Sequence, residues 1–211
     1  GITNPQQTSK NSLITNRNNI SGNSIYIDQA GDNNNISVTQ TGNNNSLQGI
    51  NQQSALIKGT GNTVTVKQGN ASDTTGQNLI KLEMNTGSNS NQVKLYQGYD
   101  SNGNMNAYDS DGHIIRLGLT GSTNQVNVYQ TNLGASNAGH FADLSVTGSS
   151  NNITITQSGN GSKTMFSTVT GNSNTISALQ DGTGQDYLGI TLTGSGHTVN
   201  ASQSGAGNHL G

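Results

Sequence analysis

The chain contains no cysteine, no tryptophan and a single proline, and only 4% of its 211 residues are aromatic. The lack of cysteine excludes disulfide bonds and leaves the redox compartment undetermined. Hydrophobic residues make up 28% of the chain, which is too few to fill a wide globular core.

Charged residues are also scarce, at 9% of the chain, and the formal net charge is −2. This balance offers no electrostatic footprint for nucleic acid or for an anionic membrane surface. No apolar run approaches the roughly 18 residues needed to span a bilayer. We therefore expect neither nucleic-acid binding nor membrane insertion.

A low hydrophobic content is typical of disorder, but disorder usually comes with a high net charge. Here the polarity is carried by Asn, Gln, Ser, Thr and Gly residues that stand at fixed offsets. Fixed offsets favour an ordered repeat over random polar filler.

One frame recurs eight times: Asn, a spacer, an apolar residue, a spacer, an apolar residue, a spacer and Gln, as in residues 151–157. Its apolar residues stand two apart, which is the period of a β-strand. Repeats of twenty-odd residues predict stacked units that cover one another's apolar faces. The frame is bounded by Asn23 and Gln29, Asn34 and Gln40, Asn62 and Gln68, Asn91 and Gln97, Asn124 and Gln130, Asn151 and Gln157, Asn174 and Gln180, and His197 and Gln203.

A second type of strand is predicted between the Gln-ended ones. Apolar residues two apart precede a Thr-Gly pair in residues 115–121, 144–148, 165–171 and 188–194, and looser copies lie at 55–61 and 80–87. One unit is then this strand, a turn of three residues and the Gln-ended strand. The glutamines at 157, 180 and 203 lie 23 residues apart.

The repeat covers residues 22–208 and leaves 209–211 as a short C-terminal end. Residues 1–21 lie outside it and are expected to form an arm that serves as a linker, an attachment segment or a capping strand. Segments 69–76, 98–112 and 131–139 are inserted after Gln-ended strands, so they are expected at one edge of the stack. The longest of them is expected to contain a small projecting hairpin.

The predicted fold is all-β: a β-solenoid of about seven to eight stacked strand-turn-strand repeats, with the cross-β spacing of amyloid. Apolar pairs such as Ile153 and Ile155, lying over Val126 and Val128, are expected to form a thin core. The Asn and Gln residues that end the frames are expected to stack in hydrogen-bonded ladders, which stabilise cross-β arrays.

The repeat resembles the curlin repeat of bacterial curli fibres, Ser-x5-Gln-x-Gly-x-Gly-Asn-x-Ala-x3-Gln. Residues 203–208, Gln-Ser-Gly-Ala-Gly-Asn, match its centre, and residues 157–161 and 180–184 match it in part. The chain departs from it in having Asn or His in place of Ser, no recurring Ala, uneven unit lengths and inserted loops. The resemblance implies a secreted subunit that polymerises into surface or biofilm fibres.

The leading hypothesis is therefore a structural subunit of an extracellular, self-assembling fibre of the functional-amyloid type. Its partner would be a second copy, stacked head to tail on an open end, and a nucleator or a secretion machinery would assist it. The alternative is a phage virion, tail-fibre or adhesin module, in which the solenoid is a stiff spacer and the 98–112 loop contacts a receptor. A carbohydrate-active solenoid enzyme would need carboxylates clustered on one face, whereas the acidic residues here stand mostly in turns.

No nucleophile elbow or phosphate-binding loop is present, so we expect no enzyme activity, no catalytic residue and no cofactor. Asp100, Asp109 and Asp111 are candidate calcium ligands, although no complete twelve-residue calcium loop surrounds them. The four histidines are scattered, and His197 is interpreted as a structural substitute for Asn. The Thr-x-Thr pairs, such as Thr63 and Thr65, do not recur in every unit, which favours ordinary outward strand residues over an ice-binding face.

Overall fold

The computed structural model describes residues 5–51, 53–69, 77–106, 112–132 and 139–211. Within these residues the chain forms one helix, α1 (Pro5–Asn18), and two β-sheets. Sheet A consists of β1 (Ser24–Ile25), β2 (Ile27–Ala30), β4 (Asn45–Gln48), β5 (Ala55–Lys58), β7 (Asn78–Met84), β9 (Ile114–Leu119), β11 (Phe141–Asp143), β13 (Lys163–Phe166), β15 (Asp186–Leu188) and β17 (His209–Leu210). Sheet B consists of β3 (Asn35–Thr41), β6 (Thr63–Gly69), β8 (Gln92–Gln97), β10 (Gln125–Gln130), β12 (Asn152–Gln157), β14 (Thr175–Gln180) and β16 (Thr198–Gln203).

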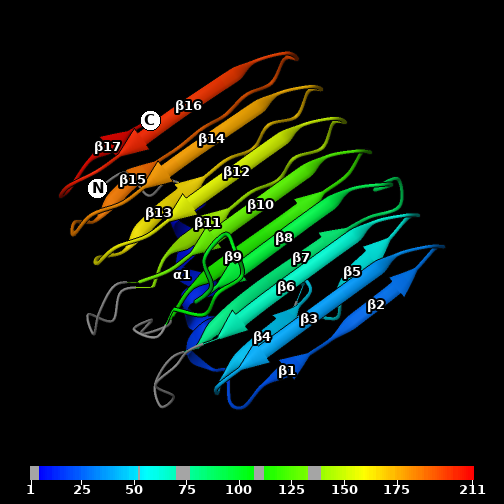
Figure 1. The fold of residues 1–211 in the computed structure, drawn as a ribbon, viewed down its shortest axis with the longest axis horizontal. Helices are drawn as coiled ribbons and strands as arrows, with labels where there is room; N and C mark the ends of the chain where they lie inside the picture. Colours follow the sequence, from blue (N-terminus) through cyan, green and yellow to red (C-terminus); the bar gives the residue numbers. More distant parts are fainter. Residues whose placement is uncertain (1–4, 52, 70–76, 107–111, 133–138) are drawn as a thin grey trace.

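The chain passes alternately through the two sheets, and one pass through sheet A followed by one through sheet B is called a coil below. Figure 1 shows the coils stacked from β1–β3 at one end to β16 and β17 at the other. Neighbouring strands within each sheet are parallel, and in sheet B the pairing stays in register from one coil to the next. The prediction of an all-β fold is confirmed in this form: parallel strands arranged in two sheets, in a solenoid-like stack.

The core is a thin layer of apolar side chains between the two sheets. Ile153 and Ile155 pair directly with Val126 and Val128, as the sequence predicts, and all four are buried. Burying such a side chain stabilises the fold by about 1.5–3 kcal/mol relative to leaving it in water. Each strand adds only a few inward apolar side chains, and each of them stacks on the equivalent side chain of the next strand. A chain with few large side chains can therefore still have a dry core.

The sheet A strands in the last coils are shorter than predicted. β11 ends at Asp143, before the predicted strand at 144–148, and β13 ends at Phe166. The backbone then leaves the extended conformation, with φ at 83° for Thr147 and 76° for Val169. Val146 and Val169 are nevertheless buried in the core, so the inward alternation continues beyond the hydrogen-bonded strands.

An insertion that the sequence analysis missed interrupts sheet A between β4 and β5. Gln48 pairs with Lys81 and Leu56 pairs with Glu83, so residues 49–54 are extra relative to β7. The loop places Ile50 over the outer face of the sheet, where its carbonyl oxygen accepts a hydrogen bond from Lys81 Nζ at 3.4 Å.

One turn shows why glycine is needed at the edges of the stack. Gly98 has a φ of +75°, and a Cβ atom there would lie 1.9 Å from the backbone oxygen of Gly69. The coil before it therefore leaves no room for a side chain. Gly87 has a φ of +101° but open space around its Cα, so only its backbone conformation favours glycine.

Helix α1 covers part of the outer face of sheet A instead of forming a strand on the first coil. Leu13 is buried against Leu79, Ile114, Phe141 and Phe166, which come from four successive coils. Figure 1 shows the helix lying behind the stack and across its middle strands. Of the three roles considered for residues 1–21, the capping strand is therefore wrong for the described part of that segment.

A basic side chain of α1 also contacts the outer face of sheet A. Lys10 Nζ donates a hydrogen bond to Thr164 Oγ1 and lies 5.5 Å from the centroid of the Phe141 ring. Burial, together with the neighbouring Arg17, lowers the pKa of Lys10. The helix thus joins several coils through both apolar and polar contacts.

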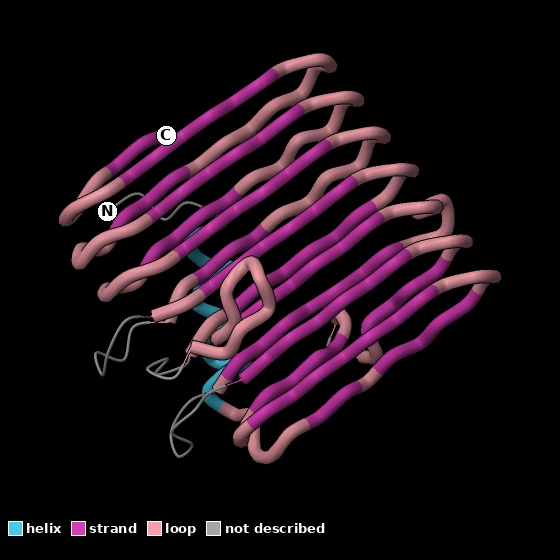
Figure 2. Tube along the Cα trace, in the orientation of Figure 1, coloured by secondary structure: helices cyan, strands magenta, loops and turns pink. Residues whose placement is uncertain are grey.

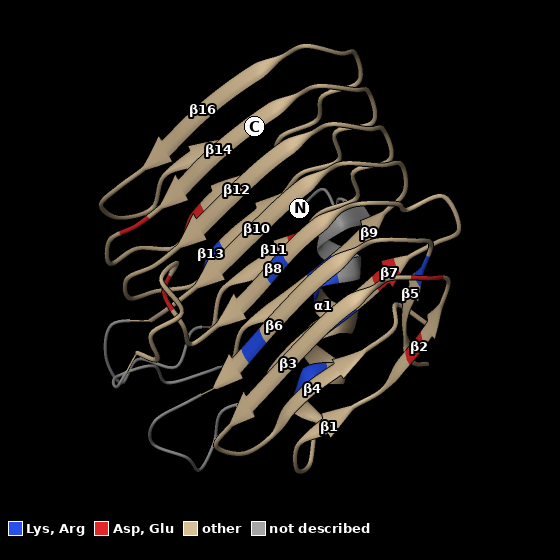
Figure 3. Ribbon diagram, turned by 45° about the vertical axis from the view of Figure 1, so that its right-hand side comes forward, with Lys and Arg blue, Asp and Glu red and all other residues tan. Residues whose placement is uncertain are grey.

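The predicted insertions leave sheet B at one edge of the stack, after β6, β8 and β10 (Figure 2). Most of segments 69–76 and 131–139, and residues 107–111 of the third, lie outside the described residues. The described part of the 98–112 segment contains the predicted hairpin, with Tyr99 paired antiparallel to Met105. Lysines, arginines and acidic residues are few and scattered over the described part of the chain (Figure 3), although Lys58 lies 3.5 Å from Asp28 and Arg116 forms an ion pair with Asp143.

Candidate functional site

A row of asparagines runs along the start of the sheet B strands. In each coil the backbone N–H donates to the Oδ1 atom of the preceding member at 2.8–3.0 Å, and Nδ2 donates to the same oxygen at 3.0–3.1 Å. At the end of the row the backbone N–H of His197 donates to Asn174 Oδ1 at 2.9 Å. The row consists of Asn34, Asn62, Asn91, Asn124, Asn151, Asn174 and His197.

A row of glutamines runs along the other end of the same strands. Each Nε2 donates to Oε1 of the glutamine in the following coil at 2.8–3.1 Å. Each Nε2 also donates to a backbone carbonyl of sheet A in its own coil, such as Ile114 for Gln130 at 3.0 Å. The side chains therefore join coil to coil and sheet to sheet. The row consists of Gln40, Gln68, Gln97, Gln130, Gln157, Gln180 and Gln203.

The remaining predicted pair, Asn23 and Gln29, does not lie in these rows. Both residues belong to the sheet A side of the first coil, where β2 pairs with β5. Gln29 is exposed, and its Nε2 atom donates to the carbonyl of Gly31 at 2.7 Å. The assignment of this frame to a Gln-ended strand is thus wrong, because strand period alone does not distinguish one sheet from the other.

Asn23 instead begins a third row, which the sequence analysis missed. Its members stand two residues before the first inward apolar residue of each sheet A strand, and their polar side chains link successive coils. Their type changes along the row, which hid the pattern. They are Asn23, Asn45, Asn78, His113, His140, Lys163, Asp186 and Asn208.

In the middle of this row, two histidines take the place of asparagine. The backbone N–H of His140 donates to Nδ1 of His113 at 3.0 Å, and the backbone N–H of Lys163 donates to Nδ1 of His140 at 3.2 Å. Because Nδ1 of His140 accepts, its Nε2 carries the hydrogen and donates to the carbonyl of Thr131 at 3.0 Å. The two rings lie 5.1 Å apart.

A fully buried ion pair follows the histidines. Lys163 Nζ lies 3.1 Å from Asp186 Oδ2, and both side chains are 0% exposed. The ammonium also donates to the carbonyls of Asn160 at 3.2 Å and Gly182 at 3.1 Å, and to that of Gly184. Further hydrogen bonds help a buried ion pair to offset its desolvation cost. Here they are made by the ammonium and by Asp186 Oδ1, which accepts from Asn208, whereas Asp186 Oδ2 has only the ion-pair contact among the described residues.

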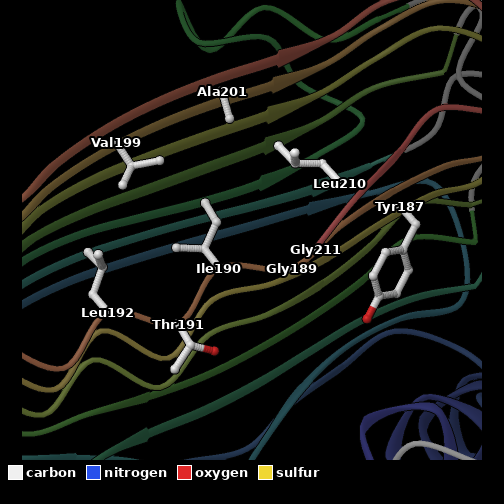
Figure 4. A pocket seen from close by; sticks show the side chains of 9 residues that line it. All are labelled: Tyr187, Gly189, Ile190, Thr191, Leu192, Val199, Ala201, Leu210 and Gly211. Atoms are coloured by element: carbon white, nitrogen blue, oxygen red, sulfur yellow. The ribbon is translucent and has the colours of Figure 1, made fainter.

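The last coil leaves the interior of the stack open. A cavity of about 510 Å³ lies between the two sheets at this end. Figure 4 shows Ile190, Leu192, Val199, Ala201 and Leu210 directed toward it from both sides. Among the described strands, β16 pairs with β14 alone, so its other edge carries unpaired backbone groups.

The first coil is open in the same way. Among the described strands β3 pairs with β6 alone, and Ile27, Ile36 and Val38 are only partly buried. Ile25 is 47% exposed and Tyr26 is 58% exposed. Both ends of the stack therefore present apolar rows beside unpaired strand edges.

Of the candidate calcium ligands, Asp109 and Asp111 lie outside the described residues. The Asp100 carboxylate accepts hydrogen bonds from the backbone N–H groups of Asn102 and Asn104, both at 2.9 Å. These bonds, that of Asn104 foremost, lower the pKa of Asp100. Its described partners thus give it a role in closing the hairpin turn.

The described residues lack two other kinds of feature. No three His, Cys, Asp or Glu side chains in this part of the chain come together as a group that could hold a metal ion. Across the same residues, no helix has both the length and the apolar character needed to cross a membrane.

Comparisons with known proteins give no relative from which a function could be carried over. No family model, no curated protein and no solved structure matches this chain.

Proposed function

We propose that this protein is the structural subunit of an extracellular, self-assembling fibre, built as a cross-β solenoid of seven to eight coils. Copies stack head to tail through the open ends and form a fibre of the functional-amyloid kind, for surface adhesion or a biofilm matrix. The extracellular setting follows from the resemblance of the repeat to the curlin repeat. The open end coils carry the assembly part of the proposal.

An unpaired parallel strand edge is a template for another strand. If β3 of one copy continues the register of sheet B on β16 of another, Ile36 lies over Val199 and Val38 lies over Ala201. This extends the pairing by which β16 itself lies on β14, with Val199 opposite Ile176 and Ala201 opposite Ala178. Apolar side chains then meet apolar side chains across the junction.

The amide rows also match at such a junction. Gln203 Nε2 already donates to the carbonyl of Tyr187 at 2.8 Å, and its second hydrogen would meet Oε1 of Gln40 in the next copy. The backbone N–H of Asn34 would donate to Nδ1 of His197, in the manner seen between His140 and His113. Unlike ends are complementary, so growth would not close on itself.

The described part of the N-terminal segment leaves both ends accessible. Helix α1 packs on the outer face of sheet A and not on the edge of β1, β2 or β3. Stacking of a further copy therefore does not require the helix to move away.

The test is electron microscopy of negatively stained protein after dilution from denaturant, together with fibre diffraction. Filaments with a meridional repeat of about 4.7–4.8 Å are expected. Discrete particles with strand-rich circular dichroism would overturn the proposal. They would favour a virion or adhesin module, in which the stack is a spacer that carries the hairpin at residues 98–106.

A matched pair of variants tests whether the open end is the growing surface. Ala201→Lys places a charge on the inward side of β16, where the next copy would bury it, and is expected to abolish filaments. Ser202→Lys places the same charge on the outward side of the same strand and is expected to leave filaments unchanged. Equal effects of the two variants would show that the edge of β16 is not the assembly surface.

A further inference from the structure

The strand register at the two ends of the stack implies how two copies join in a fibre. This inference rests on the proposed function. We propose that the coil at each junction is composite: β17 of one copy supplies its first part, and β2 and β3 of the next copy supply the rest. The β1 strand of the incoming copy is displaced.

The reason is that β17 and β1 compete for one place. In the last coil, Gln203 Nε2 bonds to the carbonyl of Tyr187, and in the first coil Gln40 Nε2 bonds to the carbonyl of Ser24. If Gln40 of an incoming copy stacks on Gln203, Ser24 of that copy would therefore have to pair with Tyr187 in sheet A. That place is already taken, because Tyr187 pairs with His209.

The two segments have equivalent chemistry. Asn208 donates from its backbone N–H and from Nδ2 to Asp186 Oδ1, at 2.9 and 3.2 Å. Asn45 donates to Asn23 Oδ1 from the same two groups, at 2.9 and 3.1 Å. Asn208 Oδ1 is thus suited to accept these bonds from Asn45 of the next copy, in place of Asn23.

The apolar positions are equivalent as well. Leu210 pairs with Leu188 and Ile25 pairs with Leu47, and all four lie in one inward row of sheet A. Leu210 and Ile25 are each 47% exposed in the single copy. In the composite coil, Leu210 would pack between Leu188 of its own copy and Leu47 of the next copy.

β1 is the part of the first coil that can leave at the smallest cost. It has two residues, pairs with β4, and is separated from β2 by Tyr26. β2 is held independently through four residue pairs with β5. Loss of β1 therefore leaves β2 and β3 in place.

The cavity at the C-terminal end lies where this junction requires an uncovered interior. It lies beside Leu210 and is lined by Ile190, Leu192, Val199 and Ala201, the part of the last coil that β17 does not cover. In the composite coil, Ile27 of β2 and Ile36 and Val38 of β3, which are only partly buried in the single copy, close it. The occupant that fits this register is a second copy of the same chain.

Cysteine pairs test the arrangement, because the natural chain has no cysteine. Disulfides need Cα atoms about 4.4–6.8 Å apart, which neighbouring strands at about 4.8 Å provide and strands two spacings apart do not. His209→Cys with Ser46→Cys reports the composite coil, and His209→Cys with Ser24→Cys reports intact stacking of β1 on β17. Ser37→Cys with Asn200→Cys reports that sheet B continues across the junction.

Filament formation by the unsubstituted chain is checked first, and its failure would overturn the proposed function itself. In filaments, oxidation is expected to give covalent multimers on denaturing gels with the 46/209 and 37/200 pairs, and monomers with the 24/209 pair. Multimers with 24/209 and monomers with 46/209 would overturn the composite coil. Multimers with 37/200 alone would also overturn it, because β17 would then be the displaced strand.

Proline variants test the same arrangement without cysteine. Leu210→Pro removes an N–H group from β17 and is expected to slow filament elongation at least tenfold. Ile25→Pro does the same to β1 and is expected to change elongation by less than twofold. The reverse order of effects would refute the composite coil while leaving the fibre itself in place.

Discussion

The buried glutamine row should contribute several kcal/mol, and Gln130 is the place to measure it. Gln130 is fully buried, and leucine has a similar size and prefers burial. The substitution Gln130→Leu therefore removes the hydrogen bonds and keeps the volume nearly constant.

Three buried groups lose a partner in this variant. Gln97 Nε2 loses its acceptor at 3.1 Å, and Gln157 Oε1 and the Ile114 carbonyl lose donors at 2.8 and 3.0 Å. Each unsatisfied buried group costs about 1–3 kcal/mol, or about 3–9 kcal/mol together. Burial of leucine returns about 1.5–3 kcal/mol. The middles of these two ranges, about 6 and about 2 kcal/mol, give an expected fall in the free energy of unfolding of about 4 kcal/mol.

The assay is urea unfolding followed by circular dichroism, in an Ala201→Lys background that keeps the protein from assembling. The matched control is Gln125→Leu, which changes an exposed, outward-facing glutamine on the same strand, β10. The control should stay within about 0.5 kcal/mol of the parent. If Gln130→Leu also stayed within about 0.5 kcal/mol of the parent, the row would be a by-product of stacking and not a source of stability.

Three further predictions concern single positions. Lys163→Met leaves the buried carboxylate of Asp186 without its cation and should lower the free energy of unfolding, measured with urea, by about 3–5 kcal/mol. Changing both Lys163 and Asp186 to Asn, the residue type found earlier in the row, should recover more than half of that loss. Burial raises the pKa of Asp143, so the protonated form is favoured in the folded state, and the free energy of unfolding should decrease as the pH rises from the ordinary aspartate value through the raised one. Asp143→Asn should remove this decrease in a pH series, and an unchanged slope would contradict the assignment. Gly98→Ala should destabilise the fold by at least about 2 kcal/mol more than Gly87→Ala. Both glycines have a positive φ, but only at Gly98 would the added Cβ atom clash with a backbone oxygen of the preceding coil. Equal losses of stability in thermal unfolding would show that the turn at Gly98 relaxes.

The recurring Asn-x5-Gln frame was sufficient to predict stacked strands and the inward apolar pairs, and the insertions after Gln-ended strands indicated one edge of the stack. Asn34 to Gln203 could be placed in this way because every frame keeps the same distance from its first residue to its Gln. Asn23 and Gln29 share the spacing but lie in sheet A, and only the pairing of whole strands shows the difference.

Other features left too little signal in the sequence. The third row changes from Asn to His, Lys and Asp, so His113 and Lys163 could be connected only through the register of the coils. The helix has few apolar residues, with Leu13 and Ile14 its main ones, and it is fixed by contacts with Phe141 and Phe166 far along the chain. The extra residues 49–54 interrupt a strand without a glycine-rich turn of the kind found at the edges.

The two amide rows of sheet B point in opposite directions. Within its row, each glutamine donates to the glutamine of the coil that follows, and each asparagine donates to the asparagine of the coil that precedes it. Their dipoles oppose each other, so a long stack would gain no large net dipole from its side chains. An inverted copy would set donor against donor in one row and acceptor against acceptor in the other. The proposed fibre would therefore have two chemically different tips, which would elongate at unequal rates.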